Sequence, residues 1–135
     1  MEACASYLYL SRLIFLQNRD LAREIETYVR EHLQEEIRAE DLCGEYGISR
    51  NRLYQVTGHG FGKGIAAYVR EIRIKTAMEL LNTTEWRISE VAREVGIPDY
   101  NYFTKVFKKY TGQTPSQYRK QQGVLENFEK ENRKE

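Results

Sequence analysis

Apolar side chains recur three and four residues apart along most of this chain, which is the spacing of one face of an α-helix. The first such stretch follows Asp20, whose carboxylate can accept the free N–H groups at a helix start. Its apolar positions are Leu21, Ile25, Tyr28, Val29 and Leu33. We therefore expect an amphipathic helix that begins at Asp20.

Two short helices are predicted next, on either side of a glycine. One covers about Ala39 to Tyr46 and ends at Gly47, and the other begins at Ser49, whose side chain can cap it. Only Gly47 and Ile48 separate the two helices. Two short helices around a tight glycine corner are the pattern of a helix-turn-helix, in which the second helix can enter a groove of DNA.

A long helix follows, and then the earlier plan returns. The long helix is predicted from Ile65 to Leu81, a stretch with no glycine or proline. A short helix then starts at Ile88 and ends at Gly96, and Asp99 is placed to cap the helix after it. The expected core positions of that helix are Phe103, Val106, Phe107 and Tyr110.

The two halves of the chain repeat one plan when the second is shifted back by about fifty residues. The matched pairs are Leu53 with Phe103, Gly62 with Gly112, and Tyr68 with Tyr118. The turn glycines Gly47 and Gly96 align after one extra residue in the second turn. The expected fold class is therefore all-α, with two helix-turn-helix subdomains joined by a long linker helix, about seven helices, and an extra N-terminal helix.

The chain is expected to divide into five segments. They are an apolar N-terminal helix (residues 1–19), a first helix-turn-helix subdomain (20–64), the linker helix (65–82), a second helix-turn-helix subdomain (83–120) and a charged C-terminal tail (121–135). A helix from Ile65 to Leu81 is ~26 Å long. The flanking modules can extend that length to about 34 Å, which is one turn of B-DNA.

The charge is distributed unevenly along the chain. Residues 1–49 carry 5 Lys and Arg against 10 Asp and Glu, whereas residues 50–120 carry 13 against 6 and residues 121–135 carry 3 against 4. The net charge of +1 therefore hides a basic middle segment. Such a segment can bind a polyanion, or it can be a solvated surface.

Length and composition exclude several other classes of protein. A chain of 135 residues with 41% hydrophobic and 30% charged residues is expected to form at most two compact, soluble units. Cys4 and Cys43 lie far apart without histidines at ligand spacing, so we expect no zinc or other metal site, no disulfide framework and no cofactor. This cysteine usage fits a reducing cytoplasm.

The second half carries a specific motif. The stretch ISEVAREVGIPDYNYFTKVFKKYTGQTPSQYRK resembles the C-terminal signature of the AraC/XylS family of bacterial transcription regulators at nearly every fixed position. Upstream, RIKTAMELL is similar to the family's linker helix and LCGEYGISRNRLYQV to its first helix-turn-helix. The resemblance covers about residues 20 to 120. It implies two DNA-reading modules that face successive major grooves on one side of the double-stranded DNA, in an activator that also touches RNA polymerase and performs no catalysis.

The resemblance also implies which side chains meet DNA. Forked or bidentate side chains suit base edges, and cations suit phosphates. The positions that match the family's base contacts are Arg50, Asn51, Tyr54 and Gln55 in the first module and Tyr100, Asn101, Thr104 and Lys105 in the second. The expected phosphate contacts are Ser49, Lys63, Lys108, Lys109 and Arg119. Asn and Gln favour adenine and Arg or Lys favours guanine, so we expect a site of mixed sequence.

A glycine-rich stretch in the middle, VTGHGFGKGI, leaves a different function open. Residues 58–64 with Lys63 could belong to a nucleotide-binding enzyme, but no strand precedes them and no Ser or Thr follows the lysine. A protein-interaction adaptor that kept the fold is a further alternative. The family usually has phenylalanine where Thr57 stands and lysine where Gly58 stands, so we expect the second module to contribute more of the DNA affinity.

The apolar run from Tyr7 to Leu16 is interrupted by Ser11 and Arg12 and is too short to span a bilayer. It also lacks the cationic start of a signal peptide, so we expect no contact with a membrane. The resemblance implies that this run forms a junction with an N-terminal sensing or dimerisation domain. The chain would then be a fragment of a longer regulator and could form a homodimer through this helix or through a missing N-terminal domain. Alternatively, the run packs on the tandem modules.

Overall fold

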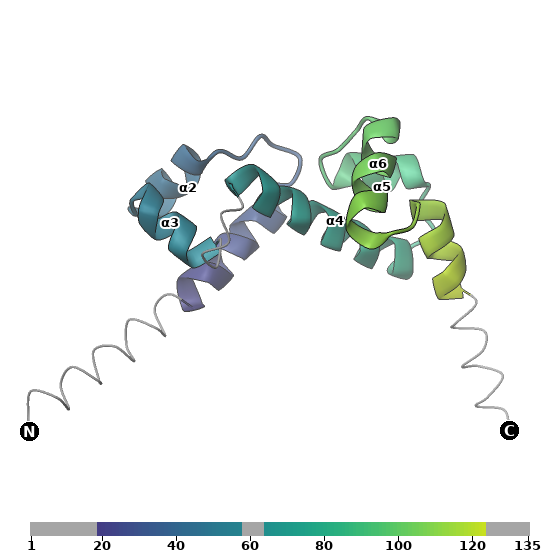
Figure 1. Cartoon of the computed structure of the whole chain (residues 1–135), viewed down its shortest axis with the longest axis horizontal. Coiled ribbons are helices and arrows are strands. Elements are labelled where there is room, and N and C mark those ends of the chain that lie inside the picture. The colour runs from purple at the N-terminus through teal and green to yellow at the C-terminus, as the bar shows by residue number, and fades with distance from the viewer. Residues whose placement is uncertain (1–18, 58–63, 124–135) are drawn as a thin grey trace, which may run out of the picture. The chain divides into compact units, whose positions relative to one another are not determined.

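The computed structural model describes residues 19–57 and 64–123, and its regular elements in these ranges are all helices (Figure 1). Seven helices lie there: residues 19–31, α2 (Ala39–Tyr46), α3 (Arg50–Thr57), α4 (Ile65–Thr83), α5 (Ile88–Glu94), α6 (Tyr100–Thr111) and residues 115–123. The predicted all-α class and number of helices are confirmed. The extra N-terminal helix and most of the glycine-rich stretch, with Lys63, lie outside the described residues.

The chain divides into two compact units. Of the described residues, the first unit comprises 19–32, 36–57 and 64–69, and the second comprises 33–35 and 70–123. The boundary after Val69 falls inside α4, so this one helix of 19 residues contributes its first turns to one unit and the rest to the other.

The first unit contains the first helix-turn-helix, made by α2 and α3. Gly47 ends α2 in the left-handed conformation with φ of 61°, which only glycine adopts without strain. The Ser49 hydroxyl oxygen accepts the Arg52 N–H at 3.2 Å and so caps α3 as predicted. The predicted cap at Asp20 is wrong, because residue 19 is already helical. The buried apolar side chains of the described part of this unit are Ile25, Val29, Leu42, Leu53, Val56, Ile65 and Val69.

Thr57 occupies a buried position at the end of α3, where the family pattern has phenylalanine. Only 4% of Thr57 is exposed. Its hydroxyl donates to the Leu53 carbonyl at 2.7 Å, which satisfies the buried polar group within its own helix. The smaller side chain is therefore accommodated without an unpaired hydroxyl.

The second unit contains the second helix-turn-helix, made by α5 and α6. Asp99 accepts the Tyr102 N–H at 3.0 Å and so caps α6, and Gly112 ends the helix with φ of 83°. The core side chains are Ile74, Ala77, Leu81, Val91, Ala92, Val95, Ile97, Phe103, Val106 and Phe107. Tyr110 was predicted to lie in this core, but 40% of it is exposed. It lies in the last turn of α6, beyond the part of the helix that the core covers.

A short segment after the first helix packs against the turn of the second helix-turn-helix. Leu33 is 7% exposed, and the Arg73 guanidinium donates to the Glu35 carbonyl at 2.9 Å. Gly96, with φ of 85°, lies so close that a Cβ atom there would be 1.8 Å from the Leu33 carbonyl oxygen. Burial lowers the pKa of Arg73, and the neighbouring charge of Arg70 lowers it further. Nothing in the sequence pattern predicted this packing.

Candidate nucleic-acid interface

The first candidate reading surface is the exposed face of α3. Helical geometry buries Leu53 and Val56 and leaves the four side chains between and before them in solvent. Those exposed side chains are Arg50, Asn51, Tyr54 and Gln55, which are the four predicted base-reading residues of the first module. The structure therefore brings the predicted set together on one helix. Whether these residues contact bases stays a prediction.

The electrostatics of α3 are unusual for a helix N-terminus. Its first turn holds Arg50 and Arg52 and no acidic residue, although the helix dipole favours negative charge at that end. The negative charge comes instead from α2, because the Glu40 carboxylate forms an ion pair with the Arg50 guanidinium. Both side chains are 60% exposed. No local sequence pattern links Glu40 with Arg50, because the two residues are ten positions apart and belong to different helices.

The second candidate reading surface is the exposed face of α6. Tyr100 is 47% exposed, and Asn101 and Lys105 are also exposed, while Phe103 is fully buried on the opposite side. Thr104 is half-buried, and its hydroxyl donates to the Tyr100 carbonyl at 2.9 Å. The hydroxyl oxygen of Thr104 remains able to accept a hydrogen bond. These four are the predicted base-reading residues of the second module.

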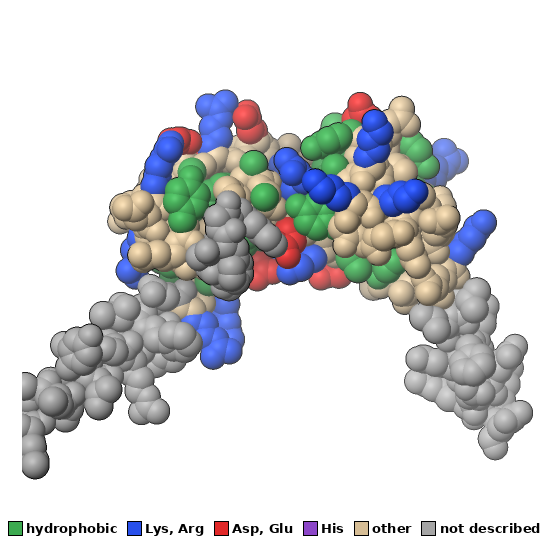
Figure 2. Space-filling view, in the orientation of Figure 1, with side chains coloured by type: hydrophobic (Ala, Val, Ile, Leu, Met, Phe, Trp, Pro, Cys, Tyr) green, Lys and Arg blue, Asp and Glu red, His purple; other side chains and the backbone are tan. Residues whose placement is uncertain are grey.

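The predicted phosphate contacts have different surroundings. Lys108 and Lys109 are exposed in the last turn of α6, where the helix dipole favours cations. The Ser49 oxygen is already used as the cap of α3. Figure 2 shows several Lys and Arg side chains on the face of the second unit that is turned to the viewer.

Arg119 has an internal role that the sequence did not reveal. Its guanidinium donates to three carbonyl oxygens around the end of α4: Leu81 at 3.4 Å, Thr84 at 3.4 Å and Trp86 at 2.5 Å. These bonds tie the last helix to the segment between α4 and α5. Phosphate contact by Arg119 was predicted from its position in the motif, and a guanidinium held in this way is a weaker candidate than Lys108.

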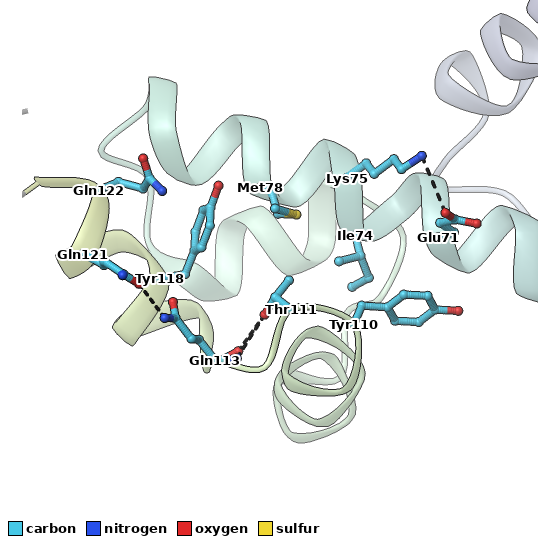
Figure 3. Close-up of a pocket in the computed structure, with 10 residues that line it drawn as sticks. All are labelled: Glu71, Ile74, Lys75, Met78, Tyr110, Thr111, Gln113, Tyr118, Gln121 and Gln122. Atoms are coloured by element: carbon cyan, nitrogen blue, oxygen red, sulfur yellow. Dashed lines mark hydrogen bonds and ion pairs between the residues drawn. The ribbon is translucent and has the colours of Figure 1, made fainter. Parts of the chain in front are cut away.

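The second unit also has a pocket of about 390 Å³ between α4, the end of α6 and the last helix (Figure 3). Met78, Ile74 and Tyr118 form its apolar part. Lys75 on its rim forms an ion pair with Glu71 at 3.6 Å. In the described ranges, no group of His, Cys, Asp or Glu side chains could hold a metal ion, and no helix is long and apolar enough to cross a membrane.

Comparisons with known proteins agree with this geometry. A model of the helix-turn-helix domain matches residues 42–121. The HTH-type transcriptional activator RhaR of Cronobacter sakazakii is 39% identical over 84 residues, which cover 62% of this chain and 30% of RhaR.

Solved structures are also similar to this chain. The C-terminal domain of AraT, a response regulator from Geobacillus stearothermophilus, has a TM-score of 0.62 and 29% identity over 75% of this chain and 84% of that one. The DNA-binding domain of AdpA, solved in complex with a target DNA, has a TM-score of 0.61 and 24% identity over 73% of this chain and 88% of that one.

The two helix-turn-helix modules and their exposed polar faces define a DNA-binding protein of the helix-turn-helix class. The chain belongs to the AraC-type helix-turn-helix family of transcription regulators, and not to an enzyme family. The nucleotide-binding enzyme that the glycine-rich stretch left open is therefore set aside. The chain spans 30% of the length of RhaR.

Proposed function

We propose that this chain recognises a specific duplex DNA sequence through α3 and α6, which enter successive major grooves. The main support for the proposal is that both α3 and α6 bury their apolar side chains on one face and expose amide, phenol and cationic side chains on the opposite face. The AdpA domain, which has the same fold, was solved with a target DNA. The helix α4, at 19 residues, is ~28 Å long and acts as the spacer between the two modules.

The roles of the side chains follow from their chemistry. Asn51, Gln55 and Asn101 can make paired hydrogen bonds to adenine, and Arg50 and Lys105 can donate to guanine. Tyr54, Tyr100 and Thr104 supply contacts to base edges and to the thymine methyl group. Lys63, Lys108 and Lys109 hold phosphates, which fixes the position of the reading helices without reading sequence.

Selection of bound sites from a pool of random duplexes, with the full chain, tests the proposal. We expect an enriched sequence and an affinity that falls steeply with salt. Asn101→Ala should relax the preference at one base position, whereas Lys108→Ala should weaken binding to all duplexes alike. Failure to enrich any sequence would contradict the proposal and would favour the protein-interaction adaptor, which keeps the fold without reading DNA.

We also propose that the protein activates transcription in the bacterial cytoplasm through contact with RNA polymerase. The name of RhaR as a transcriptional activator supports this role. Transcription in vitro from a promoter that carries the selected site should increase when the chain is added. Homodimer formation through residues 1–19 is part of the proposal, and sedimentation at several concentrations tests it, because a monomer at every concentration would contradict it.

A further inference from the structure

We infer that Glu40 is a specificity-determining residue, which holds Arg50 and thereby suppresses its binding to phosphates at non-target DNA. The inference rests on the proposed DNA-reading role of α3. Its basis is the ion pair between the Glu40 carboxylate of α2 and the Arg50 guanidinium at the first residue of α3.

The pair contributes little to folding, because both partners are 60% exposed and water screens their attraction. Its main effect is on the guanidinium, which has a local acceptor before any DNA arrives. Arg50 also lies at the positive end of the α3 dipole with Arg52 nearby and no acid in the first turn. Both features favour a carboxylate as partner, so Glu40 satisfies a site that would otherwise attract any anion.

Glu40 and DNA can bind Arg50 at the same time, because the carboxylate contacts only one terminal nitrogen of the guanidinium. The ion pair neutralises the positive charge of Arg50, and binding to phosphates depends on that charge. The edge of a guanine is uncharged and offers two acceptors to the remaining N–H groups, so this contact depends less on the net charge. Glu40 therefore lowers the affinity for arbitrary DNA more than the affinity for the target.

The second module shows the contrast. The fifty-residue repeat places Tyr100, an uncharged residue, where Arg50 stands in the first module. There the N-terminus of α6 has its own acid, because Asp99 caps it. The first module has an arginine, Arg50, at the start of its reading helix, and the carboxylate that pairs with this arginine belongs to the preceding helix.

The experiment compares Glu40→Gln with Glu45→Gln in the full chain. Glu45 lies on the same helix, near Tyr46 and the first helix, so its substitution removes the same charge away from Arg50. Affinity is measured for the duplex that the wild-type protein selects from a random pool and for a scrambled duplex. We expect Glu40→Gln to raise the affinity for the scrambled duplex up to about fivefold and to raise the affinity for the selected duplex less.

Arg50→Gln completes the test. It should weaken binding to the selected duplex, and in its background Glu40→Gln should act no differently from Glu45→Gln. If Arg50→Gln weakens target binding but Glu40→Gln and Glu45→Gln change the two affinities alike, the role of Glu40 is refuted and the proposed function stands. If Arg50→Gln leaves both affinities unchanged, the base-reading role of Arg50 fails together with the inference.

Discussion

Gly96→Ala and Gly47→Ala change equivalent turn glycines of the two modules, yet we expect very different losses of stability. Both glycines have positive φ, 85° and 61°, so an alanine side chain is strained at either position. A Cβ atom at position 47 would meet no heavy atom within 4 Å, whereas at position 96 it would lie 1.8 Å from the Leu33 carbonyl oxygen and 3.1 Å from Arg73 Nε. Comparing the two variants therefore separates the effect of backbone strain on stability from the effect of a steric clash.

The magnitudes follow from the contacts that the collision breaks. Left-handed strain alone destabilises by about 1–2 kcal/mol, which is the full effect expected for Gly47→Ala. At position 96 the Leu33–Glu35 segment must also move away. That movement exposes Leu33, worth about 2 kcal/mol, and breaks the hydrogen bond from Arg73 to the Glu35 carbonyl, worth about 1.5 kcal/mol. We expect Gly96→Ala to destabilise the second unit by roughly 4 kcal/mol or more.

Urea unfolding measures the difference. Trp86 is the only tryptophan of the chain and belongs to the second unit, so its fluorescence follows that unit, while far-UV circular dichroism follows both. Gly96→Ala should shift the fluorescence midpoint strongly, and Gly47→Ala should shift it little and act mainly on the dichroism signal. Equal, small shifts of stability for the two variants would refute the packing of Leu33 on Gly96.

Three further predictions concern binding and stability. Asn101→Ala should weaken binding to the selected duplex more than Gln55→Ala does, because α6 is capped at both ends, by Asp99 and Gly112, whereas Gly58 follows α3 in the sequence where the family usually has lysine. Fluorescence anisotropy measures both affinities, and the reverse order would contradict this prediction. Asp99→Ala should destabilise the second unit by about 1 kcal/mol, because α6 loses its N-terminal cap. An unchanged urea midpoint of the Trp86 fluorescence would contradict this prediction. Arg119→Gln should lower the thermal unfolding temperature because three carbonyls lose their donor, while the adjacent, exposed Lys120→Gln should not.

Local signals were enough to predict the helices. Glycine at the turns and oxygen-bearing caps such as Ser49 and Asp99 act within a few residues, so the sequence reveals where these helices begin and end, although the same signal at Asp20 was wrong. The exposed faces of α3 and α6 followed from the same periodicity. Tyr110 was misplaced because periodicity alone does not show where the neighbouring elements stop covering a helix.

Contacts between distant residues were beyond the reach of the sequence. The carbonyl of Leu33 against Gly96, the ion pair of Glu40 with Arg50, and the bonds of Arg119 join segments that no spacing rule connects. A single sequence shows that Arg119 is cationic, but it does not show that three backbone oxygens already use its donors. Its interpretation as a phosphate contact came from charge and motif position alone.

The unit boundary inside α4 has a consequence for recombining such regulators. A crossover between Val69 and Arg70 changes parents inside one helix, but the backbone hydrogen bonds of α4 form whatever side chains stand there, and the core of each unit, apart from the Leu33–Glu35 segment, then comes from one parent. A crossover between α4 and α5 would instead combine Ile74, Ala77 and Leu81 of one parent with Phe103 and Phe107 of the other in a single core. Chimeras with new operator preferences should therefore be spliced inside α4, at the boundary between the units.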